Sequence, residues 1–142
     1  MGETKVPLEL INLHDDGFHL LVEVVVFGQS FNVVLDTGAS KTVFDKAEIE
    51  KHMKDAELTI SDRLSTGLGT NNMESHTIIL PVLSIGKFKI KNFEAAVLDL
   101  SMISHAYSTL NLPAVIGVLG GDILKRYQAI INYKKLHLKL FR

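Results

Sequence analysis

Apolar and polar residues alternate in several stretches of the chain with a period of two, which predicts β-strands that bury one face. Near the C-terminus, for example, Leu136, Leu138 and Leu140 alternate with His137 and Lys139. Glycine, asparagine and proline residues separate these stretches and indicate turns. The pattern therefore predicts an all-β fold that is mostly strand and contains short helices.

Three strands are predicted before Asp36. Residues 8–13 end at a turn that contains Asp16-Gly17, a pair that supplies the positive φ of tight hairpins. Residues 18–27 follow as a long, valine-rich strand. A third strand over residues 31–35 leads directly into Asp36. The fold is thus expected to begin with a hairpin, and Asp36 is expected to lie at the end of the third strand.

The rest of the chain continues this pattern with two or three helices. Further strands are expected over residues 58–64, 76–85, 88–90, 93–100, 114–121, 129–133 and 136–141. Pro81 predicts an edge or a bend, because proline cannot donate a hydrogen bond to a neighbouring strand. Short helices, each capped by the aspartate at its start, are expected over residues 45–53 and 122–127. Residues 101–112 are expected to form a short helix or an irregular crossing.

Composition narrows the classes of function. The chain has 142 residues, enough to bury a core of its own, so a single domain over residues 1–142 is expected. Fifteen basic and sixteen acidic residues give a net charge of -1, which provides no field to attract nucleic acid. No residue is a cysteine, which excludes disulfides, thiolate metal sites and a cysteine nucleophile.

Signals for targeting, membranes and cofactors are not evident. The N-terminus lacks the charged start and apolar block of a secretory signal. No apolar stretch reaches the roughly 20 residues that span a bilayer. We therefore expect no signal peptide, no membrane partner and a cytoplasmic or unassigned compartment. The six histidines show no spacing typical of a metal site, so neither a metal nor another cofactor is expected.

The most informative stretch joins an apolar strand to an acid. Residues 33–35 lead into Asp36, and the chain then turns through Thr37-Gly38-Ala39-Ser40 before it becomes apolar again. One interpretation is an ordinary turn in which the carboxylate of Asp36 caps its own backbone. The apolar strand before the acid, and the sequence Val118-Leu119-Gly120 later in the chain, favour a catalytic role instead.

Peptide hydrolysis explains why such an acid needs a partner. Water must lose a proton to one group, while another group protonates the carbonyl oxygen and then the leaving amine. Two carboxylates about 3 Å apart cannot both ionise, so they share a proton and supply both the base and the acid. The sequence contains a single Asp-Thr-Gly, at residues 36–38. A working pair therefore needs a second copy of the chain, related by a twofold axis between two Asp36 side chains.

The order of these features resembles the retropepsin-like aspartic proteases, the retroviral-type single-domain enzymes, and specifically the retropepsin-like domains of bacterial proteins. The resemblance extends from about residue 18 to residue 141. It implies a closed β-barrel, with one lobe per chain, and an aspartic endopeptidase that acts on peptide substrates as a homodimer. It also implies the roles of four groups of residues: Asp36 as the catalytic acid; Thr37, Gly38 and Ala39 as the support of the catalytic loop; Val118, Leu119 and Gly120 as the motif that crosses behind that loop; and Gly67, Leu68, Gly69 and Thr70 as the flap.

Two positions depart from the retroviral pattern. Retroviral enzymes usually carry an Asp and an Arg that pair across the dimer, where this chain has Ser40 and Gly121. A retroviral-style interface with interleaved terminal strands is therefore in question. Gly67 and Gly69 are equally consistent with a plain hairpin tip. A non-catalytic retropepsin-fold module for binding or assembly is the alternative function.

Overall fold

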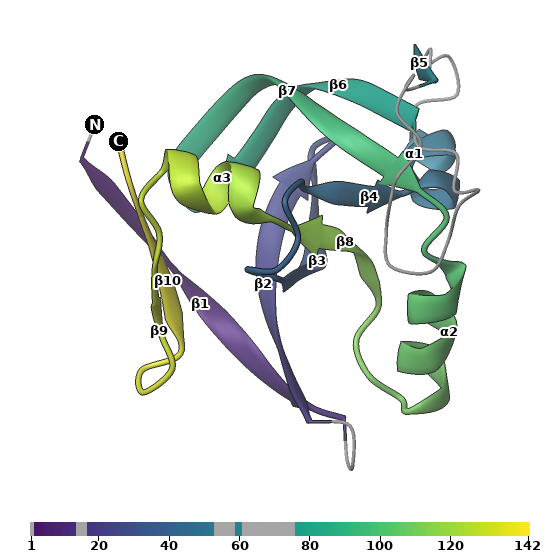
Figure 1. Cartoon of the computed structure of the whole chain (residues 1–142), viewed down its shortest axis with the longest axis horizontal. Coiled ribbons are helices and arrows are strands. Elements are labelled where there is room, and N and C mark those ends of the chain that lie inside the picture. Colours follow the sequence, from purple (N-terminus) through teal and green to yellow (C-terminus); the bar gives the residue numbers. More distant parts are fainter. Residues whose placement is uncertain (1, 14–16, 53–58, 61–75) are drawn as a thin grey trace.

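A computed structural model of the chain describes residues 2–13, 17–52, 59–60 and 76–142, and Figure 1 shows their arrangement. The described residues are mostly strand, as the alternating pattern predicts. Among them, no helix combines the length and the apolar character that crossing a bilayer requires.

The first three strands form two successive antiparallel hairpins. They are β1 (Glu3–Asn12), β2 (Phe18–Val26) and β3 (Gln29–Leu35). The two-residue turn between β2 and β3 consists of Phe27 and Gly28, both with positive φ, 56° and 71°. This is the geometry of a tight type I′ hairpin, which matches the twist of its strands. The predicted opening hairpin and the strand before Asp36 are confirmed.

Six strands close into a barrel. Besides β2 and β3, they are β4 (Val43–Asp45), β6 (His76–Ile85), β7 (Phe88–Leu98) and β8 (Val115–Leu119). The strands follow the order β6-β7-β4-β8-β3-β2, and β2 pairs with β6 to complete the ring. β5 (Thr59–Ile60) pairs with the start of β6. The expected closed, retropepsin-like barrel is therefore confirmed, although the alternation did not predict the short strand β4.

Pro81 lies where β6 changes partner. Thr77 and its neighbour pair with β5, whereas Leu83 and Ser84 pair with β2. Opposite Pro81, the β6–β7 register passes Asn92, which has a positive φ of 52°. Pro81 thus lies between the segments of β6 that pair with β5 and with β2, where its missing N–H costs no ladder hydrogen bond on that side, as the predicted edge position requires.

One large hydrophobic core joins all six barrel strands to α3 (Gly121–Arg126). Its largest fully buried side chains include Phe44, Phe88, Leu80, Leu83, Ile85 and Ile123. Burying one such side chain contributes about 1.5–3 kcal/mol. A second cluster lies under α2 (Ser101–Thr109) and contains Tyr107, Val34 and Leu21. The helical alternative for residues 101–112 is thus the one found.

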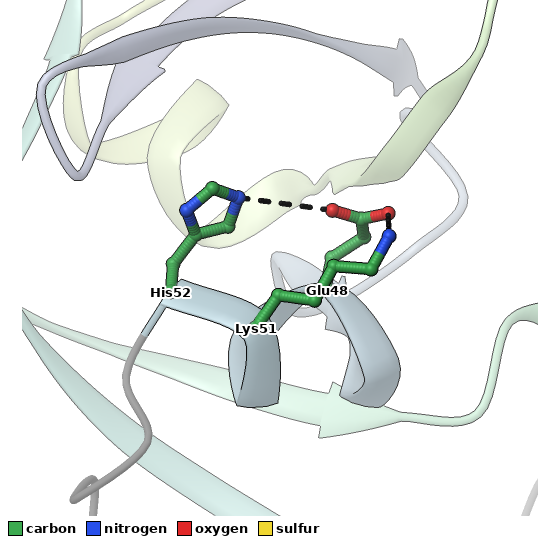
Figure 2. A network of polar contacts seen from close by, with 3 residues as sticks. All are labelled: Glu48, Lys51 and His52. Carbon is green, nitrogen blue, oxygen red and sulfur yellow. Dashed lines mark hydrogen bonds and ion pairs between the residues drawn. The ribbon is translucent and has the colours of Figure 1, made fainter.

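The helix α1 (Lys46–His52) confirms the predicted short helix after β4. In Figure 2, Lys51 and His52 both approach the Glu48 carboxylate, at 3.2 Å and 3.9 Å. His52 also stacks on Phe27, with 5.3 Å between the ring centroids. Exposed ion pairs contribute little to stability, so this stacking against the β2–β3 turn is the more important contact.

The predicted helix caps need correction. Asp45 directly precedes α1, but its carboxylate accepts a hydrogen bond from the Leu100 N–H at 2.9 Å. α3 begins at Gly121 with Gly120 as its N-cap, so Asp122 lies in the first turn and not at the cap position. The Asp122 carboxylate still accepts the Ile123 N–H at 2.8 Å, as a capping group would. Sequence rules for caps consider local donors only, whereas here both aspartates also bind segments far away in the chain.

The two ends of the described chain come together. β10 (His137–Phe141) pairs antiparallel with β1, and β9 (Ile130–Asn132) pairs with the other side of β10. The Arg142 N–H donates to the Gly2 carbonyl at 2.9 Å, and Figure 1 shows both ends at the same side. The predicted C-terminal hairpin is confirmed. In the strand order of the described residues, β9 is an edge.

Candidate active site

Asp36 follows the last residue of β3 and is exposed to solvent. Its N–H donates to the Leu119 carbonyl at 3.0 Å, because β3 and β8 run parallel with Leu35 opposite Leu119. The Asp36 carbonyl accepts from the Ala39 N–H at 3.2 Å and so closes a turn. The acid is therefore held at the end of a barrel strand with its backbone fixed on both sides.

The carboxylate of Asp36 has a backbone partner of its own. The Gly38 N–H donates to its Oδ1 at 2.9 Å. A Cβ on residue 38 would lie 3.3 Å from the same oxygen, so a larger residue here would require a small shift of the carboxylate. Glycine avoids that shift. Thr37, between them, is exposed.

The second motif lies directly behind this loop. The Gly121 N–H donates to the Ala39 carbonyl at 2.7 Å. A Cβ on Gly120 would lie 2.6 Å from the carbonyl carbon and oxygen of Lys41, closer than real Cβ contacts allow. Any side chain at residue 120 would therefore push the two segments apart. The structure brings together the two groups of residues that the sequence analysis singled out, 36–39 and 118–120.

A threonine and an aspartate join the two segments. The Thr42 hydroxyl donates to Asp122 Oδ1 at 2.7 Å and accepts from the Gly120 N–H at 3.0 Å. The Thr42 N–H lies 3.0 Å from both oxygens of the same carboxylate. Thr42 is buried, so these bonds are protected from water. Sequence reasoning missed this pair; the signal was a polar residue, Thr42, directly before the apolar Val43-Phe44.

Asp36 opens onto a cavity of about 340 Å³. Its walls are mostly apolar and come from β2, β3, β8, α2 and the C-terminal hairpin: Phe18, Leu20, Val34, Leu35, Ile103, Val118, Ile131 and Tyr133, together with His19 and Thr37. Phe18 and Tyr133 are exposed at 63% and 68%, although both are large and aromatic. An acid in a cavity lined mainly by apolar side chains, with a few polar groups among them, is the usual composition of a small ligand or peptide site.

His19 was also missed as a site residue. Its Nδ1 lies 2.5 Å from the Tyr107 hydroxyl, and the two rings stack at 5.9 Å between centroids. Tyr107 comes from α2 and is buried, which raises the pKa of its phenol. In the sequence, a histidine in a strand 17 positions before Asp36 carries no signal, because only the strand register places it there.

The predicted flap, Gly67 to Thr70, lies outside the described residues. A second aspartate at the end of a strand, Asp99 after β7, accepts a hydrogen bond from the Ser101 N–H at 2.9 Å at the start of α2. That bond lowers the pKa of Asp99. Within the described part of the chain, no group of three or more His, Asp or Glu side chains could hold a metal ion.

Comparisons with known proteins agree with this geometry. A family model described as "Aspartyl protease" matches residues 22–123. A comparison with curated proteins finds no significant match.

Three solved structures have a similar fold. A retropepsin-like aspartic protease from Rickettsia conorii shares 24% identity, with a TM-score of 0.59, over 99% of this chain and 90% of that one. The retroviral protease-like domain of Ddi1 from Leishmania major shares 20%, with a TM-score of 0.55, over 82% of each chain. The EIAV protease complexed with the inhibitor HBY-793 shares 22%, with a TM-score of 0.56, over 79% of this chain and 90% of that one.

Proposed function

Because the chain belongs to the aspartyl protease family and has the retropepsin-like fold, we propose that it is an aspartic endopeptidase that acts as a homodimer. Each copy contributes one domain and one Asp36. The single observation that carries the proposal is the setting of Asp36, an exposed carboxylate held by the Gly38 N–H in a cavity lined mainly by apolar side chains.

The face around Asp36 supports a dimer. Phe18 and Tyr133 expose most of their aromatic surface at the cavity. Ile131, from the edge strand β9, lines the same cavity. Burying such exposed aromatic surface in an interface is favourable, and an edge strand has backbone groups free to pair with a further strand. A second copy on this face, with the twofold axis near Asp36, would bury the exposed aromatic side chains and would bring a strand to the edge of β9.

In the proposed reaction, the two Asp36 carboxylates share one proton. The ionised carboxylate takes a proton from a water molecule, and the resulting hydroxide attacks the peptide carbonyl carbon. The protonated carboxyl gives its proton to the carbonyl oxygen. Transfer of a proton to the amide nitrogen then breaks the C–N bond and releases an amine and a carboxylic acid. The substrate is an extended peptide, the form that pairs with strand edges in a cleft.

A non-catalytic module for binding or assembly remains the second candidate. Two observations favour it. Ser40 and Gly121 lack the charges that pair across retroviral dimers, and β1 pairs with β10 of its own chain, so it is not free to interleave with a partner. In this alternative the cavity binds a peptide segment and does not cleave it.

Asp36→Asn separates the two candidates. The variant keeps a side chain of the same shape but cannot act as a base. For the enzyme, a peptide library is cleaved between about pH 3 and pH 8, the rate per chain rises with protein concentration, and Asp36→Asn reduces it at least about a hundredfold. Dimerisation is measured on the same samples by sedimentation. Equal cleavage by Asp36→Asn, or no cleavage by a proven dimer across that pH range, overturns the enzyme proposal.

A further inference from the structure

His19 and Asp36 line the same cavity. The β2–β3 ladder ends at the pair Leu21–Val34, and His19 and Asp36 each lie two residues beyond that pair. Side chains two residues apart on a strand project to the same face, so His19 projects to the same face of β2 as Leu21.

The His19 ring is held in a defined orientation from the other side. Tyr107 is 3% exposed, and its hydroxyl contacts His19 Nδ1 at 2.5 Å while the rings stack at an interplanar angle of 27°. A ring held by both a hydrogen bond and stacking cannot rotate freely. Tyr107 contacts Nδ1, so Nε2 is the ring nitrogen left for a bond to a ligand in this proposal.

His19 and Ile103 line two cavities. One contains Asp36; the other, of about 240 Å³, lies along α2 and is lined also by the apolar side chains of Leu13, Met102, Ala106 and Leu110, with Tyr107. Among the described residues that line the two cavities, His19 is the one side chain able to carry a positive charge. A peptide side chain that enters from Asp36 toward α2 therefore passes this imidazole.

We propose that His19, oriented by Tyr107, is a specificity-determining residue that selects a peptide with a carboxylate side chain close to the scissile bond. This inference rests on the proposed function and names the class of substrate for the same site. A charge-assisted hydrogen bond from an imidazolium N–H to a carboxylate is stronger than a neutral one. Apart from Asp36, the described side chains that line the two cavities carry no negative charge that would compete for His19.

Histidine is the side chain whose charge commonly changes between about pH 5 and pH 8, so pH is the variable that tests this selection. The titratable groups around the His19 ring are Asp36 at the end of β3, Tyr107 on α2 and Tyr133 after β9. Burial raises the pKa of Tyr107, so its hydroxyl stays neutral throughout this range. Selection of a carboxylate is therefore expected to be strongest toward pH 5. A pair of aspartates that share one proton is also catalytically active at acidic pH.

The test compares pairs of peptides that differ only by Glu or Gln, scanned through the positions next to the cleavage site. For the unchanged protein, the Glu/Gln ratio of kcat/KM at one position rises about fivefold to tenfold between about pH 7.5 and pH 5. His19→Phe keeps the stacked ring and abolishes that rise. Tyr107→Phe keeps the imidazole but reduces the rise. His105→Gln, on the exposed side of α2, is the matched control and leaves it unchanged.

A ratio measured on one preparation is insensitive to partial unfolding, so a poorly folded variant does not hide the effect. The same rise in His19→Phe overturns the proposal. Binding of the two peptides to Asp36→Asn, measured by fluorescence anisotropy, separates this inference from the proposed function. If no peptide is cleaved but the Glu peptide still binds better in the presence of His19, the enzyme proposal fails and the selection stands. Equal binding with normal cleavage overturns the selection alone.

Discussion

The Thr42 hydroxyl donates a 2.7 Å hydrogen bond to the Asp122 carboxylate, although 80 residues separate them in the sequence. The same hydroxyl accepts the Gly120 N–H at 3.0 Å. Thr42 therefore connects the loop that follows Asp36 to the start of α3. The loop after Asp36 and the start of α3 are thus joined within one chain by the neutral Thr42 hydroxyl and the Asp122 carboxylate. These two residues lie close in sequence to Ser40 and Gly121, where retroviral enzymes carry their paired charges.

Removing the Asp122 carboxylate should destabilise the protein. Asp122→Ala leaves the buried hydroxyl and N–H of Thr42 without their acceptor, so we expect a loss of about 2–3 kcal/mol in the free energy of unfolding. Asp122→Asn keeps one acceptor oxygen and should lose less. Urea unfolding monitored by circular dichroism measures both. An Asp122→Ala protein as stable as its parent contradicts this role.

Gly120 and Gly121 offer a matched pair of substitutions. In Gly120→Ala, the added Cβ would lie 2.6 Å from the Lys41 backbone, and we expect a loss of at least about 2 kcal/mol and of any cleavage activity. In Gly121→Ala, the added Cβ would lie 3.3 Å from the Ala39 oxygen, a contact that a small shift relieves. Thermal unfolding and peptide cleavage are measured on both. Equal losses in the two variants would show that close packing at residue 120 is not the cause.

Tyr133 tests the face proposed for the dimer. Tyr133→Asp places a charge on the exposed rim of the Asp36 cavity, so the dissociation constant of the dimer should rise at least about tenfold because burying an unpaired charge is costly. Ile79→Asp, at another exposed apolar position on β6, is the control. Analytical ultracentrifugation gives the dissociation constant. An unchanged dimer in Tyr133→Asp places the interface elsewhere.

His137 should make stability depend on pH. Partial burial, together with the charges of Lys5, Lys135 and Lys139, lowers the pKa of His137 in the folded chain. The unfolded chain therefore binds the proton more readily. The contribution of His137 is complete above the ordinary histidine pKa of about 6.5 and is lost as pH falls toward the folded-state value.

We accordingly expect His137→Gln to lose less stability than its parent protein between about pH 7.5 and pH 5. The urea midpoint at each pH is the measurement, and His105→Gln serves as the control because His105 is exposed on α2. A parent and a His137→Gln protein with the same pH dependence argue against this contribution.

Most of the strands could be predicted, because alternation and turn residues are local signals. β6 is found at its predicted bounds, residues 76–85. The turn between β2 and β3 is Phe27-Gly28, so β3 begins two residues before the expected strand over residues 31–35. β4 was not predicted because three residues are too few to show a period. The caps failed for a different reason: Asp45 and Asp122 bind partners that the sequence does not place near them.

For the candidate site, the sequence by itself determined which acid stands at the end of an apolar strand and which glycine-containing segment could cross behind it. Both are properties of short stretches, so local patterning is sufficient. Only the tertiary structure decided that Thr42 binds Asp122 and that His19, held by Tyr107, lines the same cavity as Asp36. Those relationships depend on strand register and on helices packed against distant strands, which no local pattern encodes.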